Sequence, residues 1–380
     1  MKIFALDVET TIYNKGDPFD QRNKLILGGY GTNDTCIYFN NNQDQSITQL
    51  LARASLVIGF NFKFDLHWLR NIGVTIPIRL PVWDCQLAEF ILSNQTWKYP
   101  SLEESCSKRG LGHKIDIIKS KYWDNGIDTD CVPKEELEEY LKQDISLTFA
   151  LYEAQKVEFK KPEHAGKYNL FRLQCYDLLV LQAMEYNGYL FDQKGATDAS
   201  KLLTEECLKL DRTILNEFPD VPINLASPDH VSCMLYGGTI TEEIYVPIGT
   251  YKSGPRAGQV KLKKFPKEYV MPRLIEPDKK TALAKEGYYG TSEEVLRNLE
   301  STGRVKTIIG NILTRRGIAK LQGTYYNGIP KLIESHCWKD SIVHGQLNQC
   351  VAKSGRLTAT KPNQQNMPGG CKKFCITRYE

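Results

Sequence analysis

The sequence predicts a mixed α/β domain at the N-terminus, followed by a mostly α-helical region with a β-rich insertion. Short β-prone runs separated by Asn, Asp and Gly, with one helical segment, occupy the first 60 residues, and further segments with helical spacing follow them. After Leu170 long helical patterns dominate, interrupted at 237–290 by a stretch rich in Gly, Pro, Lys and Tyr. We therefore expect domains at 1–165 and 166–380, with 237–290 as a surface insertion.

The first domain begins with strand-like runs at Ile3–Leu6, Lys24–Tyr30 and Thr35–Phe39. Ile47–Ala54 has helical spacing, and Ser55–Phe60 is a further apolar run. This succession of strands and helices predicts a mixed sheet covered by helices.

Further helices are indicated along the first domain. Asn61 suits the N-cap of a helix that Gly73 ends, and Val82–Leu92 has an amphipathic pattern. Ser101–Glu104 is typical of a capping box, and Pro133 is placed to begin a helix that carries Tyr140 and Asp144 on one face.

In the second domain we expect several helices joined by short breaks and one late strand. They are Leu170–Asn187, Ala196–Phe218, Ser227–Tyr236, Ser292–Leu299, an interrupted Arg304–Glu334 and the strand-like Ile342–Leu347. The insertion at 237–290 lacks helical periodicity, so we interpret it as a β-hairpin or extended segment.

Composition restricts the classes of protein. Eleven scattered cysteines without a C-x-x-C pair favour reduced thiols and argue against a disulfide frame or a zinc ribbon. No apolar run approaches the roughly 20 residues of a membrane helix, and the chain opens in a strand-like segment rather than a signal peptide. We expect a cytoplasmic protein with no membrane partner.

The net charge of +4 conceals an asymmetry along the chain. Residues 1–165 hold 19 Lys and Arg against 23 Asp and Glu, whereas residues 301–380 hold 13 against 3. This division favours an acidic catalytic module and a basic surface that meets a polyanion, with a merely solvated basic face as the alternative.

The chemistry is indicated first by Asp7 and Glu9. Residues two apart on a strand point to the same face, so these carboxylates project together from an apolar strand. Two close carboxylates repel each other unless a cation lies between them, which predicts half of a divalent-metal site. The alternative is a strand that ends in a solvated turn. Asp144, on the apolar face of its helix, is costly to bury unless something binds it.

Three motifs occur in order at Asp7-Val8-Glu9-Thr10, Asn61-Phe62-Lys63-Phe64-Asp65 and Tyr140-Leu141-Lys142-Gln143-Asp144. Together they resemble the proofreading 3′–5′ exonucleases of the DEDD superfamily, in the branch that contains tyrosine. The histidine branch is excluded because the position five before Asp144 is Glu139. The resemblance implies a ribonuclease H-like (DnaQ-like) fold for 1–165.

The resemblance also implies roles for these residues. Two divalent ions, Mg²⁺ or Mn²⁺, would activate water and stabilise the leaving oxygen. Asp7 would bridge the ions, Glu9 and Asp144 would complete one site, Asp65 would act through waters, and Tyr140 would orient the attacking water. Thr10 and Asn61 would contact the terminal nucleotide. Phe64 would either stack on a base or belong to the core.

The second half is similar to family A DNA polymerases. Six segments resemble the thumb of that family or the segment before its palm motifs: Glu185–Asp192, Ser227-Pro228, Lys320–Tyr326, Gln346–Gln349, Ser354–Thr358 and Lys361–Pro368. The insertion at 237–290 is similar to those of phage members. Arg356 would reach the primer end, and Asn363, Gln365 and Asn366 would contact sugar, phosphate and base edges.

Neither the palm aspartates nor the finger lysine of that family is found after Pro368. We therefore expect the proofreading part of a phage-type polymerase in the host cytoplasm. It would bind a single-stranded 3′ end and primer-template DNA, and would polymerise only with a separate C-terminal chain, unless the sequence is truncated. The alternatives are a DNA-binding or assembly subunit of a split polymerase with secondary nuclease activity, and a stand-alone exonuclease of RNase D type.

Overall fold

A computed structural model describes residues 2–114 and 117–378 of the chain. Contacts divide the chain into two compact units, one formed by residues 1–195 with 328–380 and the other by residues 196–327. The predicted boundary at residue 165 lies inside the first unit, because α7 (Lys167–Asn187) packs on α2, α3 and β5 of the preceding region. The predicted mixed α/β fold is confirmed.

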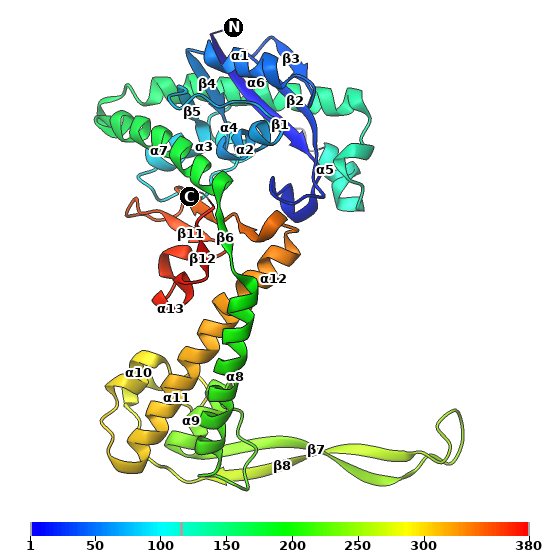
Figure 1. Cartoon of the computed structure of the whole chain (residues 1–380), viewed down its shortest axis with the longest axis vertical. Helices are drawn as coiled ribbons and strands as arrows, with labels where there is room; N and C mark the ends of the chain where they lie inside the picture. Colours follow the sequence, from blue (N-terminus) through cyan, green and yellow to red (C-terminus); the bar gives the residue numbers. More distant parts are fainter. Residues whose placement is uncertain (1, 115–116, 379–380) are drawn as a thin grey trace. The chain divides into compact units, whose positions relative to one another are not determined.

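A five-stranded sheet organises the first unit, with β1 (Ile3–Thr10) at its centre (Figure 1). The strand order is β3 (Cys36–Phe39), β2 (Leu25–Gly31), β1, β4 (Leu56–Gly59) and β5 (Val82–Asp84). β1–β2 and β2–β3 are antiparallel, whereas β1–β4 and β4–β5 are parallel. Phe4, Ala5, Leu6 and Val8 of β1 are buried in the main hydrophobic core, and this packing fixes the strand that carries Asp7 and Glu9.

Helices cover this sheet, and the longest of them packs on β1, β2, β3 and β4. It is α6 (Lys134–Glu158), which begins directly after Pro133, as predicted. The other helices of this part are α1 (Asp44–Ala52), α2 (Lys63–Asn71), α3 (Cys85–Leu92), α4 (Leu102–Lys108) and α5 (Ile117–Lys121). The Ser101 hydroxyl caps α4 by accepting from the Glu104 amide, so the N-cap half of the predicted capping box is confirmed, while the Glu104 carboxylate accepts from the Ser101 hydroxyl.

Two local predictions were wrong. Val82–Leu92 is not one helix, because Val82–Asp84 pair with β4 as a strand and the Asp84 carboxylate then caps α3 by accepting from the Leu87 amide at 2.9 Å. Asn61 is not the N-cap of α2, because its φ of 56° places it in the left-handed region and Phe62 precedes the first helical residue.

The same unit contains the C-terminal part of the chain. β6 (Tyr189–Phe191) lies between β9 (Ile342–Val343) and β12 (Cys375–Ile376) in an antiparallel sheet. β10 (Gln346–Asn348) pairs with β11 (Thr358–Thr360), so the single predicted strand Ile342–Leu347 is divided between two sheets. The helices here are α12 (Gly328–Ser335) and α13 (Gly369–Lys372).

The second unit is a helical body with one long hairpin (Figure 1). Its core is built largely from four helices: α8 (Gln193–Leu215), α9 (Pro228–Tyr236), α10 (Glu293–Asn298) and α11 (Gly303–Leu321). The buried core residues include Ile214, Met234, Leu235 and Ile312. A π-helical turn, Gln322–Tyr326, follows α11. The predicted insertion contains β7 (Gly238–Thr250) and β8 (Val260–Met271), paired antiparallel.

Short 3₁₀ segments connect these elements. They are Tyr13–Lys15, Trp123–Asn125, Thr129–Cys131, Pro162–His164, Lys279–Thr281, Lys339–Ser341 and Gln364–Asn366. In the parts of the chain that the structure describes, no helix is both long and apolar enough to cross a bilayer.

Candidate active site

The predicted carboxylates meet beside the polar end of β1. Asp7 lies opposite Gly29 of β2, and a Cβ at Gly29 would lie 2.8 Å from the Ile145 side chain and 3.1 Å from that of Leu141. The missing side chain therefore lets α6 pack directly on the sheet, and this close approach brings Asp144 to β1.

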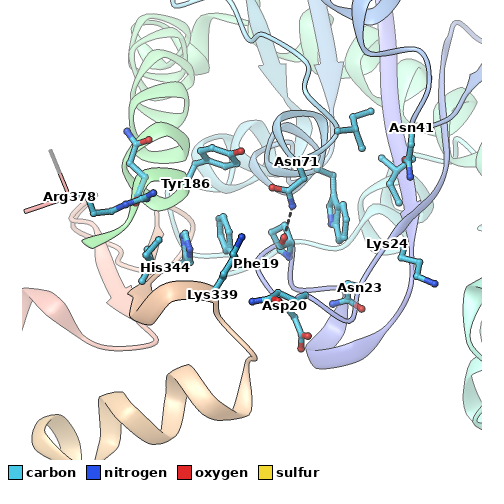
Figure 2. Close-up of a pocket in the computed structure, with 17 residues that line it drawn as sticks. Phe19, Asp20, Asn23, Lys24, Asn41, Asn71, Tyr186, Lys339, His344 and Arg378 are labelled. Atoms are coloured by element: carbon cyan, nitrogen blue, oxygen red, sulfur yellow. Dashed lines mark hydrogen bonds between the residues drawn. The ribbon is translucent and has the colours of Figure 1, made fainter. Parts of the chain in front are cut away.

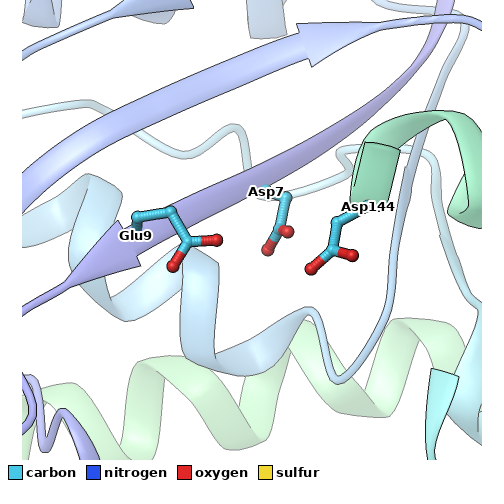
Figure 3. Close-up of side chains that lie close together, drawn as sticks. All are labelled: Asp7, Glu9 and Asp144. Atoms are coloured by element: carbon cyan, nitrogen blue, oxygen red, sulfur yellow. The ribbon is translucent and has the colours of Figure 1, made fainter. Parts of the chain in front are cut away.

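Asp7, Glu9 and Asp144 each place one carboxylate oxygen within 4.8 Å of the others (Figure 3). Asp65 joins them from the first turn of α2, where it is 2% exposed and accepts a hydrogen bond from the Val8 amide at 3.1 Å. These four residues, called the carboxylate cluster below, come from three distant segments of sequence. The structure thus brings together all four predicted metal-ligating residues.

The electrostatics of the carboxylate cluster are those of crowded, poorly solvated anions. Burial raises the pKa of Glu9 well above its usual range, and the negative charges of Asp7 and Asp144 raise it further. Burial also raises the pKa of Asp65, with a second contribution from Asp7, whose own pKa is raised by burial. Such carboxylates favour a compensating cation or a proton.

One cation of the chain already reaches the carboxylate cluster. Lys114, in the loop after α4, donates to Asp144 Oδ2 at 2.5 Å, and its Nζ lies 4.5 Å from the centre of the Tyr140 ring. Burial opposes the charge on Lys114, but the Asp144 carboxylate outweighs it and raises the lysine pKa. Sequence reasoning missed Lys114, because a single lysine in a polar loop carries no periodic or motif signal.

Tyr140 is the fifth predicted catalytic residue and lies on α6 one turn before Asp144. The side chain is buried, and burial followed by the charges of Asp144 and Glu9 raises its pKa above the usual value. Its hydroxyl therefore keeps its proton at neutral pH and can donate a hydrogen bond. This suits a residue that orients water rather than one that removes a proton.

The donor set fits hard divalent cations. All four residues offer carboxylate oxygens, which Mg²⁺ and Mn²⁺ prefer, and Figure 3 shows three of the side chains directed toward one another. The raised pKa values of Glu9 and Asp65 result from burial and repulsion by neighbouring carboxylates, which a bound cation would relieve.

The residues predicted to contact the terminal nucleotide differ in their surroundings. Asn61 and Phe64 line one cavity of about 320 Å³ together with Tyr99, Gln346 and Asn348. Thr10 is buried at the end of β1, and its hydroxyl donates to the Thr11 carbonyl at 3.0 Å. Nucleotide contact by these three residues stays a prediction.

The predicted primer contacts lie in the C-terminal part of the first unit. Arg356 is exposed in the connection between β10 and β11. Asn363, Gln365 and Asn366 are exposed in and beside the 3₁₀ turn that follows β11. Their exposure is compatible with a nucleic-acid contact, and DNA binding by them also stays a prediction.

A buried polar network fixes the position of α2. Glu185 of α7 receives hydrogen bonds from Lys63 Nζ at 2.6 Å and from the Leu347 amide at 2.5 Å, and its second oxygen lies 2.9 Å from His67 Nε2. Lys63 and His67 flank Asp65 on α2, so this network holds the helix that carries one member of the carboxylate cluster.

A second contact connects the N-terminal loop to the C-terminal segment of the same unit. The Phe19 ring stacks on His344 with 3.8 Å between centroids and 4° between planes, and both line a cavity of about 480 Å³ (Figure 2). His344 Nδ1 lies 2.9 Å from the Glu185 carbonyl oxygen. The segment 328–380 is therefore integrated with the domain that carries the carboxylate cluster.

With this geometry described, comparison with known proteins shows which proteins the chain resembles. Residues 263–378 match the model of DNA polymerase family A. The chain therefore contains a family A DNA polymerase-like region.

Curated relatives extend this similarity over most of the chain. It is 26% identical over 313 residues to DNA polymerase I of Synechocystis sp., covering 81% of this chain and 26% of that protein. It is 25% identical over 319 residues to DNA polymerase I of Pseudomonas aeruginosa, covering 82% and 30%. DNA polymerase I of Bacillus subtilis is 30% identical over 193 residues, which cover 50% and 16%.

The chain thus spans less than a third of the length of these relatives. The fold agrees with a solved structure described as the POL domain of Pol1 from M. smegmatis in complex with DNA primer-template and dNTP. The TM-score is 0.66 at 16% identity, and the match covers 96% of this chain and 52% of that one. The fold is therefore similar to about half of that solved polymerase domain.

Proposed function

We propose that this chain is the proofreading part of a family A DNA polymerase and removes nucleotides from DNA 3′ ends by metal-dependent phosphodiester hydrolysis. The observation that carries the proposal is the convergence of Asp7, Glu9, Asp65 and Asp144, from three distant segments, beside Tyr140. The mixed five-stranded sheet with β1 at its centre supports the expected ribonuclease H-like arrangement. The similarity to DNA polymerase I supports DNA as the substrate.

In this proposal the carboxylate cluster holds two divalent cations, Mg²⁺ or Mn²⁺. When bound, such ions supply an activated water and stabilise the leaving 3′ oxygen. Asp7 has a carboxylate oxygen within 4.8 Å of Glu9 and Asp144 and is hydrogen-bonded to Asp65, so it would be a ligand available to both ions. The Val8 amide fixes Asp65 in its rotamer, and the tight α6–β2 packing at Gly29 fixes Asp144.

The remaining side chains act on the substrate and the water. Tyr140 donates its hydroxyl proton in a hydrogen bond to the attacking water and so fixes the direction of attack. Lys114 compensates the charge of Asp144 and limits repulsion of the incoming phosphate. Asn61 and Phe64, which share one cavity, hold the terminal nucleotide with Thr10.

The test is degradation of 5′-labelled single-stranded DNA by the purified chain in Mg²⁺. We expect stepwise shortening from the 3′ end and a loss of about 10³-fold or more in Asp7→Ala. Glu153→Ala is the matched control, because Glu153 is an exposed carboxylate on the helix that carries Asp144. Digestion that continues in EDTA, or that survives in Asp7→Ala, would refute the assignment, and a preference for RNA ends would favour the RNase D-type alternative.

A second candidate function is DNA gripping by a polymerase subunit, with the nuclease secondary. The family A match at 263–378, which includes the exposed Arg356, favours it. Primer-template affinity that persists in Asp7→Ala and falls in Arg356→Ala would support this role. The separate polymerase chain expected from the sequence stays a prediction, and co-purification of such a chain would test it.

A further inference from the structure

The β7–β8 hairpin is attached to the second unit at one end only. Ile240 and Met271, at its root, are buried in the core of that unit. From Glu243 outward the side chains are exposed or half-buried, and cross-strand pairing continues to Thr250 and Val260. A two-stranded ribbon is marginally stable on its own, so contact with a binding partner would stabilise this one.

The charge of the hairpin is separated along its length. Residues 244–267, called the basic half below, contain six basic residues and no acidic one. Two of the six have acidic partners nearer the root: Lys264 pairs with Glu243 at 2.5 Å, and Lys267 lies opposite Glu242. The other four basic residues lie farther out, at Lys252, Arg256, Lys261 and Lys263.

The positions of the exposed aromatic side chains on the ribbon bear on whether single-stranded or duplex nucleic acid would bind. Tyr245 is 61% exposed and Phe265 is 40% exposed. Phe265 pairs with Ile244, whereas Tyr245 pairs with Lys264, so the two rings point to opposite faces of the ribbon. These two rings therefore cannot stack on the same single strand from one face of the ribbon.

We propose that the basic half of the hairpin binds the phosphate backbone of duplex DNA. A cluster of lysine and arginine without intervening acids is complementary to a polyanion, and each phosphate contact releases a counterion. The major groove of B-DNA admits a two-stranded β-ribbon, so the ribbon can lie along a groove while its lysines reach the flanking phosphates. This arm is independent of the nuclease, because it shares no residue with the carboxylate cluster.

The experiment measures binding of the full-length chain to a blunt, labelled DNA duplex by fluorescence anisotropy across a salt titration in EDTA. The test variant carries Lys252→Gln, Arg256→Gln, Lys261→Gln and Lys263→Gln. We expect at least about a tenfold weaker affinity near 0.1 M salt, and a salt slope less steep by about 3 to 4, because each lost phosphate contact removes about 0.9 from the slope.

The matched control removes four exposed charges elsewhere, with Lys134→Gln, Lys156→Gln, Lys160→Gln and Lys161→Gln. We expect this control to keep the wild-type slope. An equal fall in the control and the test variant would overturn the proposal in favour of an effect of net charge. Unchanged affinity and slope in the test variant would overturn it as well, and would leave an acidic protein segment as the partner to examine.

A second variant removes the basic half altogether, so that the result does not depend on how the four-substitution variant folds. Glu243 and Pro266 are cross-strand partners, so residues 244–265 can be replaced by Asn-Gly to close a short hairpin at that pair. We expect this variant to lose duplex affinity at least as strongly as the charge variant, while nuclease activity on single strands is unchanged. Wild-type duplex affinity in the shortened chain would overturn the proposal.

Discussion

The carboxylate cluster and the basic half of the β7–β8 hairpin are two charged regions built in opposite ways. The carboxylate cluster gathers like charges from β1, α2 and α6 in buried surroundings, where burial raises the pKa of Asp7, Glu9 and Asp65 and neighbouring carboxylates raise those of Glu9 and Asp65 further. The hairpin spreads its charges along an exposed ribbon whose pairing is local. Buried like charges persist only where a cation compensates them, whereas exposed charges cost little and attract a partner at a distance.

The same contrast holds for two ion pairs of nearly equal length. Lys63–Glu185 measures 2.6 Å with side chains 17% and 4% exposed, whereas Lys264–Glu243 measures 2.5 Å with side chains 54% and 65% exposed. Distance alone would rank the two pairs as equals. The difference in burial predicts that only the Lys63–Glu185 pair contributes measurably to stability, because removing one partner of a buried pair leaves an uncompensated buried charge.

The largest expected effect concerns Glu9→Gln. We expect nuclease activity to fall about 10³-fold, because the amide is a poor ligand for a hard cation. We also expect thermal stability in EDTA to stay equal or rise, since burial and the charges of Asp7 and Asp144 disfavour ionised Glu9 in the folded chain. Nuclease assays and melting curves check both halves, and a large loss of stability would contradict the description of the cluster as repulsive.

The next effect concerns Glu185→Ala, compared with Glu243→Ala. The first variant leaves Lys63 and His67 without their carboxylate in a buried network, so we expect a loss of about 3 to 5 kcal/mol in the free energy of unfolding. The second removes an exposed pair, and we expect no measurable change. Urea denaturation of both variants gives the two changes in the free energy of unfolding. Equal changes would contradict the claim that burial decides the contribution of an ion pair.

The smallest effect is a pH dependence carried by His344. Burial lowers its pKa to about 4 from 6.5, although the hydrogen bond to the Glu185 carbonyl acts the other way. Between these values the unfolded chain binds a proton that the folded chain does not, so stability falls as pH falls. From pH 7 to pH 5 we expect wild type to lose about 2 kcal/mol more than His344→Gln. Equal losses in urea titrations would contradict the assignment.

Much of the fold could be predicted because its signals are local. The periodicity after Pro133 correctly placed Tyr140 and Asp144 on one buried side of α6. Val82–Leu92 was wrong because three residues pair with β4, a tertiary contact that overrides helical spacing. The left-handed backbone of Asn61 likewise depends on the junction of β4 and α2, which no local pattern describes.

The residues of the candidate site that belong to short sequence motifs could be predicted, and those brought in only by the folded chain could not. Asp7 and Glu9 share a strand face by simple alternation, but Lys114 reaches Asp144 only through the folded chain. The network around Glu185 was invisible for the same reason, since it joins α2, α7 and β10 across more than a hundred residues of sequence. Residues that support a site from a distance leave little trace in sequence.

The central claim is that the carboxylate cluster is a divalent-metal site. The most direct measurement counts Mn²⁺ ions bound per chain by electron paramagnetic resonance, in wild type and in Asp7→Ala, with circular dichroism to confirm that both fold. We expect about two ions per wild-type chain and a clear loss in Asp7→Ala, because this carboxylate is placed to serve both. No bound Mn²⁺ in wild type, or an unchanged number in Asp7→Ala, would contradict the account.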